Sequence, residues 1–312
     1  MYTEPIRLRP AFKDYIWGGT RLKTEYNKQS DLDVLAESWE LSTHPDGEST
    51  VASGPHAGLR LSALIDLCGR EILGSNAARF ADFPILIKLI DAKDNLSIQV
   101  HPDDAYAQAH TGGYGKTEMW YILDCAPGAS LYYGFNQPLT KAQLRSHIAD
   151  NTLLSVLRQV PVKKGDVFFI PAGTVHAIGK GIMICEIQQN SNTTYRVYDY
   201  GRRDTQGKTR PLHIAQAVEV ADLNPTPLTK PAQDGVLAAC PYFTVKKLNL
   251  DGSQTIRITT ASFHSLIVTS GSGTLSLGGT TLPFQKGDSL FVPAQHSSYT
   301  LSGRGELILS SV

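Results

Sequence analysis

The sequence has few cysteines, and their spacing argues against two kinds of site. Cys68, Cys125, Cys185 and Cys240 are scattered through 312 residues and never form a C-x-x-C pair. Neither a thiolate zinc knuckle nor a disulfide framework is therefore indicated. We expect buried, reduced thiols, and we expect any metal ion to be held by His, Glu, Asp or Gln.

An excess of charge of either sign is also missing. The chain has 29 basic and 29 acidic side chains. This balance gives no general attraction to nucleic acid or to an anionic membrane surface, so we expect neither as a partner. An anionic ligand would have to be met by a local cluster of basic residues.

Long hydrophobic runs are absent as well. Residues 1–8 lack the basic start and apolar stretch of a signal peptide, and no later run is apolar enough to span a bilayer. We therefore expect a cytoplasmic protein. With 41% hydrophobic and 19% charged residues, the composition is that of an ordinary globular protein, and the length allows two domains.

One pattern occurs twice, 122 positions apart. Residues 164–176 begin with KGDVFFIP and residues 286–298 begin with KGDSLFVP. Gly-Asp is typical of a turn and the apolar run of a buried strand, which together predict a hairpin of a small β-barrel. The first copy ends at His176, where the second has Ser298. The shared residues therefore indicate scaffold, and the differing residue indicates chemistry.

The pattern along the rest of the chain predicts a mainly β protein. Apolar alternation predicts strands at residues 37–42, 83–100, 119–123, 130–133, 166–171, 182–188 and 195–200. Helical spacing predicts helices at residues 61–80 and 211–220, and one or two more within 139–160, where Thr140 is the expected N-cap.

The predicted elements divide into two domains. Residues 225–235 form a polar, proline-rich linker. Residues 1–235 would be the first domain, with a small helical insertion around 139–160. Residues 236–312, with short strands split by Gly and Ser, would be a second, smaller and degenerate barrel.

Four polar residues have the types and order of a metal site. On a strand, Ser97, Gln99 and His101 share one face while the apolar residues between them take the other. Glu118 begins an apolar strand, and His176 follows the turn at Pro171. Gln99, His101, Glu118 and His176 would offer nitrogen and oxygen donors suitable for zinc and tolerable for manganese, iron or cobalt.

Each of these residues alone is more often an ordinary hydrogen-bonded or solvated side chain than a ligand. Together they follow the order used in metal-binding cupin barrels, and the second copy of the hairpin acts as an internal control. There we align Glu118 with Phe263 and His176 with Ser298, so the barrel does not need these polar groups to fold. We interpret His264 and His296 as out of register and non-ligating.

Longer motifs resemble one family. Residues 97–104 (SIQVHPDD), 115–121 (GKTEMWY), 171–177 (PAGTVHA) and 188–199 (QQNSNTTYRVYD) closely resemble the type I mannose-6-phosphate isomerases in their short bacterial form. The likeness extends over nearly the whole chain. It implies two cupin-type (jelly-roll) β-barrels and one zinc ion per chain, held by Gln99, His101, Glu118 and His176, with Arg196 acting in catalysis.

The resemblance also implies a reaction, the interconversion of mannose 6-phosphate and fructose 6-phosphate through an enediol. This chemistry needs an electrophile, a base for the carbon-bound proton and a clamp for the phosphate. Lys116 and Glu186 are both candidates for the base, and the sequence does not choose between them. Ser97, Arg196 and Arg202 match family positions for phosphate binding, with Arg202 in place of a lysine, and Lys116 is a further candidate substrate contact.

Two other functions are compatible with a cupin. The chain could be a non-catalytic module that binds a sugar phosphate, which would favour loss of Lys116, Glu186 or Arg196, yet all three are present. It could instead be a metal-dependent oxygenase or an isomerase of another sugar. A neutral Gln99 with a single Glu118 disfavours the oxygenase, whose iron site is usually rich in histidine. The sequence does not indicate the oligomeric state.

Overall fold

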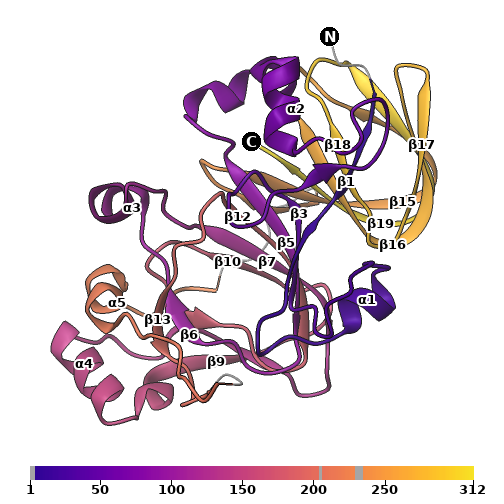
Figure 1. The fold of residues 1–312 in the computed structure, drawn as a ribbon. Coiled ribbons are helices and arrows are strands. Elements are labelled where there is room, and N and C mark those ends of the chain that lie inside the picture. The colour runs from indigo at the N-terminus through magenta and orange to yellow at the C-terminus, as the bar shows by residue number, and fades with distance from the viewer. Residues whose placement is uncertain (1–3, 204–205, 229–234) are drawn as a thin grey trace. The chain divides into compact units, whose positions relative to one another are not determined.

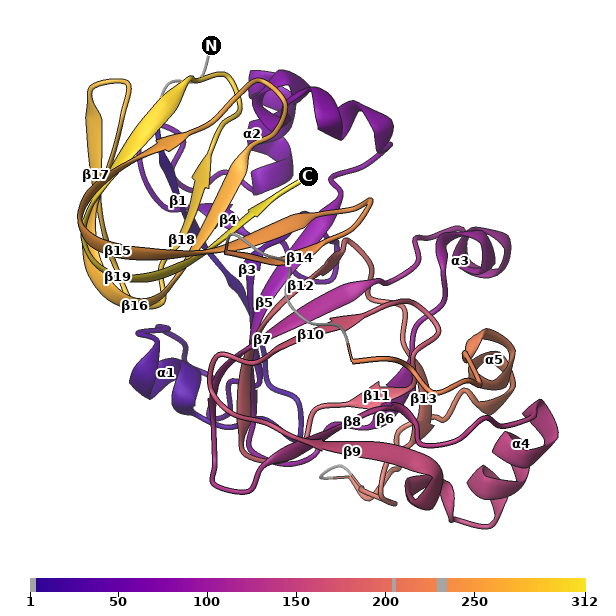
Figure 2. The same ribbon diagram turned by 180° about the vertical axis from the view of Figure 1, so that it is seen from behind.

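The computed structural model describes residues 4–203, 206–228 and 235–312 of a mainly β chain (Figure 1, Figure 2). Two compact units make up the chain, and neither is a continuous segment. Unit 1 comprises residues 1–13, 20–89 and 231–312, and unit 2 comprises residues 14–19 and 90–230. The division into domains 1–235 and 236–312 stays a prediction, and most of its linker, residues 229–234, lies outside the described residues.

Unit 1 is built on a large sheet to which both early and late parts of the chain contribute. Its order is β14-β15-β19-β16-β18-β1-β4, with β17 paired to β16. The bounds are β14 Val236–Ala239, β15 Thr244–Arg257, β19 Ser298–Ser311, β16 His264–Leu277, β18 Ser289–Val292, β1 Ile6–Arg9, β4 Thr50–Val51 and β17 Thr280–Gln285. A smaller pair, β2 (Ala11–Lys13) and β3 (Glu37–Leu41), and a helix, α1 (Arg21–Glu25), also belong to this unit.

The expectation of short strands after residue 242 is wrong for β15, β16 and β19, each of which has 14 residues. Glycine lies inside these strands because neighbouring backbones come too close for a side chain. A Cβ on Gly271 would lie 1.8 Å from the carbonyl oxygen of Arg304, and one on Gly305 would lie 2.0 Å from that of Ser270. These glycines therefore permit the close approach of two paired strands, and they do not end a strand.

The single helix predicted for residues 61–80 is also wrong. The segment forms α2 (Leu61–Cys68) and two 3-10 turns, η1 (Arg70–Leu73) and η2 (Ser75–Arg79). Gly69 and Gly74, with φ of 84° and 89°, interrupt it. A positive φ is incompatible with a continuous α-helix, and the apolar spacing alone did not reveal the two breaks.

Unit 2 contains two sets of paired strands. One set has the order β10-β7-β12 and the other β13-β6-β11-β8-β9. The strands are β6 Ile98–Val100, β7 Glu118–Cys125, β8 Ser130–Phe135, β9 Leu157–Pro161, β10 Val167–Ile170, β11 His176–Ala177, β12 Ile182–Gln189 and β13 Tyr195–Tyr198. The strand β5 (Ile85–Ala92) leads the chain into this unit.

The helices of unit 2 are α3 (Asp104–Thr111), α4 (Lys141–Ala149) and α5 (Ile214–Val220), with a 3-10 turn at η3 (Leu153–Val156). Thr140 is confirmed as the N-cap of α4, where it forms a capping box with Gln143. Apolar residues from α4, α5 and the strands β6 and β13 share one buried cluster. None of the described helices could cross a membrane.

The four cysteines are free thiols, as expected. Only Cys185 is fully buried, so the expected burial is wrong for Cys68, Cys125 and Cys240. Cys185 lies within β12, a strand that is buried along its whole length, whereas Cys68 is the last residue of α2 and Cys125 the last residue of β7.

The two copies of the repeated pattern form the same hairpin. The amide of Gly165 donates to the carbonyl of Ile122, and that of Gly287 donates to the carbonyl of Val268, both at 2.8 Å. In each copy the aspartate after the glycine accepts a hydrogen bond from a backbone amide three residues earlier. The shared residues are therefore scaffold, as their repetition indicated.

Strand register corrects the alignment of Glu118 with Phe263. In the first hairpin Ile170 pairs with Glu118, and in the second Val292 pairs with His264. His264 is thus the counterpart of Glu118, and the expectation that it is out of register is wrong. Its Nδ1 lies 3.1 Å from the Tyr299 hydroxyl, and it lies in no group of potential metal ligands found among the described residues.

The hairpin glycines provide a matched pair of substitutions. Gly165 and Gly287 have similar φ, 89° and 93°, but a Cβ on Gly287 would lie 1.9 Å from the carbonyl oxygen of Tyr26, whereas one on Gly165 would meet nothing within 4 Å. We expect Gly165→Ala to lower the free energy of unfolding by about 1 kcal/mol through backbone strain, and Gly287→Ala to lower it by about 2 kcal/mol more. Denaturant titration measures both, and equal losses would contradict the close approach.

Burial, and to a smaller extent Lys246, lower the pKa of His264 to about 4. Because the unfolded chain binds a proton near pH 6.5 and the folded one does not, this group makes the protein less stable as pH falls from about 6.5 to 4. The free energy of unfolding should fall by up to about 1.4 kcal/mol per pH unit in this range. We expect His264→Gln to flatten the dependence of the free energy of unfolding on pH in this range, and an unchanged slope would count against it.

Candidate metal centre

The strands of unit 2 bring the predicted ligands together. Gln99 lies on β6 and His176 on β11, and the two residues are direct partners in the register of these strands. His101 follows β6 immediately, and Glu118 is the first residue of β7. Three short-range features of the sequence, the Gln-x-His spacing, the start of an apolar strand and the residue after a Pro-Ala-Gly turn, thus converge in space.

His101, Glu118 and His176 form a compact group. One potential ligand atom from each lies within 4.8 Å of the others. The Nε2 atoms of His101 and His176 lie 3.7 Å and 3.3 Å from the oxygens of Glu118. All three side chains are buried, with no more than 1% of each residue exposed. Two imidazoles and a carboxylate are donors that divalent transition metals prefer.

Backbone carbonyls orient both imidazoles. The Nδ1 atom of His101 lies 2.9 Å from the carbonyl oxygen of Thr193, and that of His176 lies 2.8 Å from the carbonyl oxygen of Thr174. An Nδ1–H that donates to a carbonyl leaves Nε2 as the acceptor on the Glu118 side. Burial, opposed by the hydrogen bond to Thr174, lowers the pKa of His176 to about 4, which keeps this ring neutral. These residues therefore fit a divalent metal ion.

Gln99 lies beside this group. Its Nε2 is 3.5 Å from Nε2 of His176, and its Oε1 is 3.3 Å from the Ser97 hydroxyl. Rotation of the amide by half a turn would present the oxygen to His176 instead. The structure thus brings all four predicted ligands together, with Gln99 linking the group to Ser97.

Both candidate bases lie at the same site. The ammonium of Lys116 is 2.5 Å from Oε2 of Glu118 and 3.7 Å from Oε1 of Glu186. It also lies 3.2 Å from Nε2 of His101. Lys116 lies two residues before β7, and its ammonium lies beside the Glu118 carboxylate.

Trp120 is a site residue that the sequence argument missed. Its indole Nε1 donates a hydrogen bond of 2.8 Å to Oε2 of Glu186, its direct partner in the register of β7 and β12. Its ring also lies edge-on to His176, with 5.3 Å between centroids. The available signal was its position two residues after Glu118, which puts both on one face of β7.

Arg196 connects to the ligands through Ser97. Its Nε donates to the Ser97 hydroxyl at 3.3 Å and its Nη1 donates to the carbonyl of Pro211 at 3.0 Å. On β13 it is the register partner of Gln99. Burial lowers the pKa of its guanidinium, as do Arg210 and Arg202, whereas Asp199 raises it.

Two further arginines pair with Asp199. Arg202 and Arg210 both form ion pairs with its carboxylate. Only 17% of the Arg202 side chain is exposed, so Arg202 is not a solvated surface residue. Arg210 was not predicted from the sequence, since a contact between residues eleven positions apart leaves no periodic signal.

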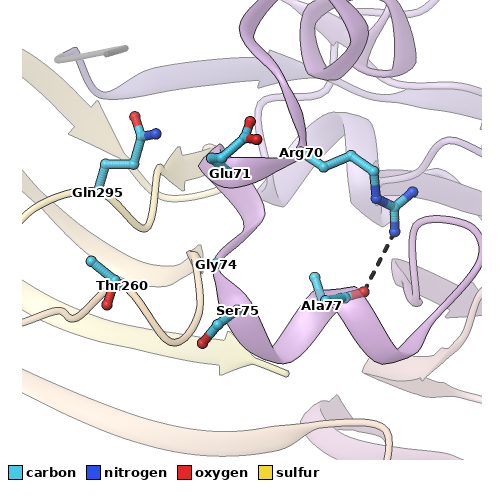
Figure 3. A pocket seen from close by; sticks show the side chains of 8 residues that line it. Arg70, Glu71, Gly74, Ser75, Ala77, Thr260 and Gln295 are labelled. Carbon is cyan, nitrogen blue, oxygen red and sulfur yellow. Dashed lines mark hydrogen bonds between the residues drawn. The ribbon is translucent and has the colours of Figure 1, made fainter.

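A surface hollow in unit 1 contains none of the predicted site residues (Figure 3). It is lined by Arg70, Glu71, Gly74, Ser75, Ala77, Ala78, Thr260 and Gln295. The guanidinium of Arg70 donates to the carbonyl of Ala77, within η2, and to those of Phe80 and Ala81, which follow it. Its charge therefore stabilises the local backbone, and the hollow offers no group of metal ligands.

Known proteins resemble this chain along its length. Residues 6–121 match the family model "Phosphomannose isomerase type I, catalytic domain", and residues 234–312 match "Mannose-6-phosphate isomerase, cupin domain". The chain is 40% identical to a mannose-6-phosphate isomerase of Streptococcus mutans, with 98% of each chain covered. It superimposes on the crystal structure of the mannose 6-phosphate isomerase from Bacillus subtilis with a TM-score of 0.90, 38% identity and 99% of each chain covered.

A more distant structure shares the fold. It is a mannose 6-phosphate isomerase bound with zinc and yttrium, 19% identical, with a TM-score of 0.76 and 98% of each chain covered.

Substitution of two glutamates separates metal binding from the rest of the site. We expect Glu118→Gln to weaken binding of a divalent metal ion by at least about 10-fold, because it removes the only carboxylate of the three-residue group. Glu186→Gln, a matched change at the neighbouring carboxylate, should leave metal content near that of the unmodified protein. Metal analysis after equilibrium dialysis measures both, and full metal content in Glu118→Gln would rule out the assignment.

Proposed function

This chain belongs to the type I mannose-6-phosphate isomerases, a family of aldose–ketose isomerases, and on that premise we propose that it interconverts mannose 6-phosphate and fructose 6-phosphate through an enediol. The observation that carries the proposal is the buried group of His101, Glu118 and His176 with Lys116 and Glu186 beside it. The same site holds an oriented pair of imidazoles, a lysine and a second carboxylate, which suits proton transfer next to a metal ion.

We assign one zinc ion per chain to Gln99, His101, Glu118 and His176. The nitrogen and oxygen donors of this set, with the neutral ring of His176 among them, support zinc, as does the zinc bound in the distant structural relative. When bound, the ion would polarise the sugar oxygens and offset negative charge on the enediol. The backbone carbonyls of Thr193 and Thr174 keep the two rings turned toward that position.

The base is assigned to Glu186. Lys116 is engaged by Glu118 at 2.5 Å, and an ammonium held by a carboxylate can donate a proton but cannot accept one. The indole of Trp120 donates a hydrogen bond to Oε2 of Glu186. The other carboxylate oxygen of Glu186, Oε1, faces Lys116. Glu186 would take the proton from C2 or C1 and return it to the other carbon. Lys116 would donate to a sugar oxygen.

Arg196 would hold negative charge that develops on the substrate or on its phosphate. A guanidinium stays protonated even when partly buried, and its planar fork suits either oxyanion. The Ser97 hydroxyl accepts a hydrogen bond from Nε of Arg196 and so fixes that edge of the guanidinium. Arg202 is held by its ion pair with Asp199. Ser97, Lys116, Arg196 and Arg202 are therefore the proposed substrate contacts.

The finer features of the fold belong to the same proposal. The hairpin geometry shared by the copies at Gly165 and Gly287 supports two cupin-type barrels, the first with a helical insertion that includes α4. The cytoplasmic location stays a prediction from the amino-acid pattern.

The coupled assay of mannose 6-phosphate conversion tests this function. Activity should vanish when the protein is stripped with chelator and return with zinc. A protein that binds zinc but does not act on mannose 6-phosphate would instead favour a sugar-phosphate-binding module.

Arg196→Ala tests the role of the guanidinium. We expect kcat/KM to fall by about 100-fold or more, as for loss of an oxyanion donor, while bound zinc stays near stoichiometric. Arg203→Ala is the matched control, because Arg203 is exposed and, among the described residues, its guanidinium donates to the backbone carbonyl of Gly207. Loss of zinc in Arg196→Ala would make this arginine structural.

A further inference from the structure

Three arginines of unit 2 gather around one aspartate. Arg210 binds both carboxylate oxygens of Asp199, through Nε at 2.8 Å and Nη2 at 2.6 Å. Arg202 donates through Nη2 to one of the same oxygens and through Nη1 to the carbonyl of Asn95. Arg196 is close enough that both other arginines lower its pKa, after the larger effect of burial. These four residues are called the arginine cluster below.

The arginine cluster carries more positive charge than it neutralises. Three guanidiniums and one carboxylate leave a net charge of +2. In the Asp199 ion pairs, the exposed side-chain fractions are 17% for Arg202, 23% for Arg210 and 6% for Asp199. Burial alone would raise the pKa of Asp199, but the hydrogen bonds from Arg210 and Arg202 outweigh it and hold this pKa below its usual range. The carboxylate is thus ionised and fully used by two of the three cations.

Donor groups remain available in the cluster. Nε of Arg202 is buried and has no hydrogen-bond partner among the described residues. Arg210 uses Nε and Nη2 on Asp199, so its hydrogen bonds within the described chain leave Nη1 unused. Uncompensated, partly buried positive charge with unused donors is costly in a folded protein unless an anion completes it.

The cluster is joined to the metal centre by a short chain of contacts. Nε of Arg196 donates to the Ser97 hydroxyl, and that hydroxyl lies 3.3 Å from Oε1 of Gln99. A ligand that spans both places would have its reacting end at the metal centre and an anionic end at the arginines. A phosphate monoester carries nearly two negative charges at neutral pH and accepts hydrogen bonds from several guanidiniums at once.

We propose that Arg210 is a further residue that binds the substrate phosphate, and that Asp199 is a positioning residue that holds Arg202 and Arg210 in place for it. The proposal rests on the proposed function, because the phosphate is that of the substrate. In this arrangement the Asp199 carboxylate neutralises one positive charge of the cluster and fixes the positions of Arg202 and Arg210. The cluster would discriminate for phosphorylated sugars over neutral ones.

The two variants Asp199→Asn and Arg210→Met test this, with Arg203→Ala as control. We expect each of the first two to raise KM for mannose 6-phosphate by about 10- to 100-fold, with kcat within about 3-fold and zinc content unchanged. The inhibition constant of inorganic phosphate should rise by a similar factor. Arg203→Ala should change neither quantity.

Asp199→Asn separates positioning from simple attraction. It removes a negative charge, so a purely Coulombic role predicts tighter binding of phosphate, whereas positioning predicts weaker binding. Tighter binding in Asp199→Asn, or an unchanged KM and inhibition constant in Arg210→Met, would overturn the proposal. If Asp199→Asn does not fold, Arg210→Met decides alone, because Asp199 keeps its ion pair with Arg202.

Binding of inorganic phosphate also distinguishes this inference from the proposed function. Titration calorimetry of the zinc-loaded protein with phosphate needs no turnover. Phosphate binding that Arg210→Met weakens would support the cluster even if mannose 6-phosphate were not isomerised. Isomerisation with phosphate binding unaffected by Arg210→Met would reject the cluster and leave the function intact.

Discussion

The burial of one carboxylate, Glu118, is the constraint on which unit 2 depends. An ionised carboxylate with no exposed surface is stable only if charges and donors around it compensate for lost water. Here an ammonium lies 2.5 Å away and two imidazoles lie within 3.7 Å. His176 comes from β11, His101 directly follows β6 and Lys116 lies two residues before β7, so the fold and the chemistry of the site share a single electrostatic requirement.

The second hairpin shows what happens when that requirement is removed. It keeps the glycine turn and the aspartate hydrogen bond of the first, but His264 takes the register position of Glu118, and Ser298 takes the place of His176 in the sequence repeat. Its Glu118 position holds no carboxylate, and the buried carboxylate near its turn, Glu40, pairs with Lys28, whose ammonium also donates to the carbonyl of Gly287. The scaffold is thus independent of the site it carries in unit 2.

The parts of the structure that follow from local patterns could be predicted. Strand alternation placed Gln99 and His101, a capping box placed the start of α4, and the shared turn identified the repeated hairpin. The errors arose where backbone geometry overrides side-chain spacing, as at Gly69, Gly74 and Gly271. The alignment of Glu118 with Phe263 missed by one residue, which in a strand exchanges the two faces.

Other features depend on contacts that are distant in sequence, and no periodicity signals them. The carbonyl of Thr193 that orients His101 is 92 residues away, and Trp120 reaches Glu186 across 66. Arg210 meets Asp199 although eleven positions separate the two residues in the sequence. Residue type indicated the candidate ligands, but their orienting partners could be found only from the folded chain.

The interleaved order of the two units has a consequence for synthesis of the chain. All of unit 2 has been made once residue 230 leaves the ribosome, whereas strand β1 of unit 1 must wait for β18, with which Ile6 pairs through Phe291. At 5 to 20 residues per second, roughly 4 to 16 seconds separate the synthesis of residues 230 and 312. During that interval the early segments of unit 1 expose strand edges that have no partner yet, so the growing chain is most exposed to aggregation just after unit 2 is complete.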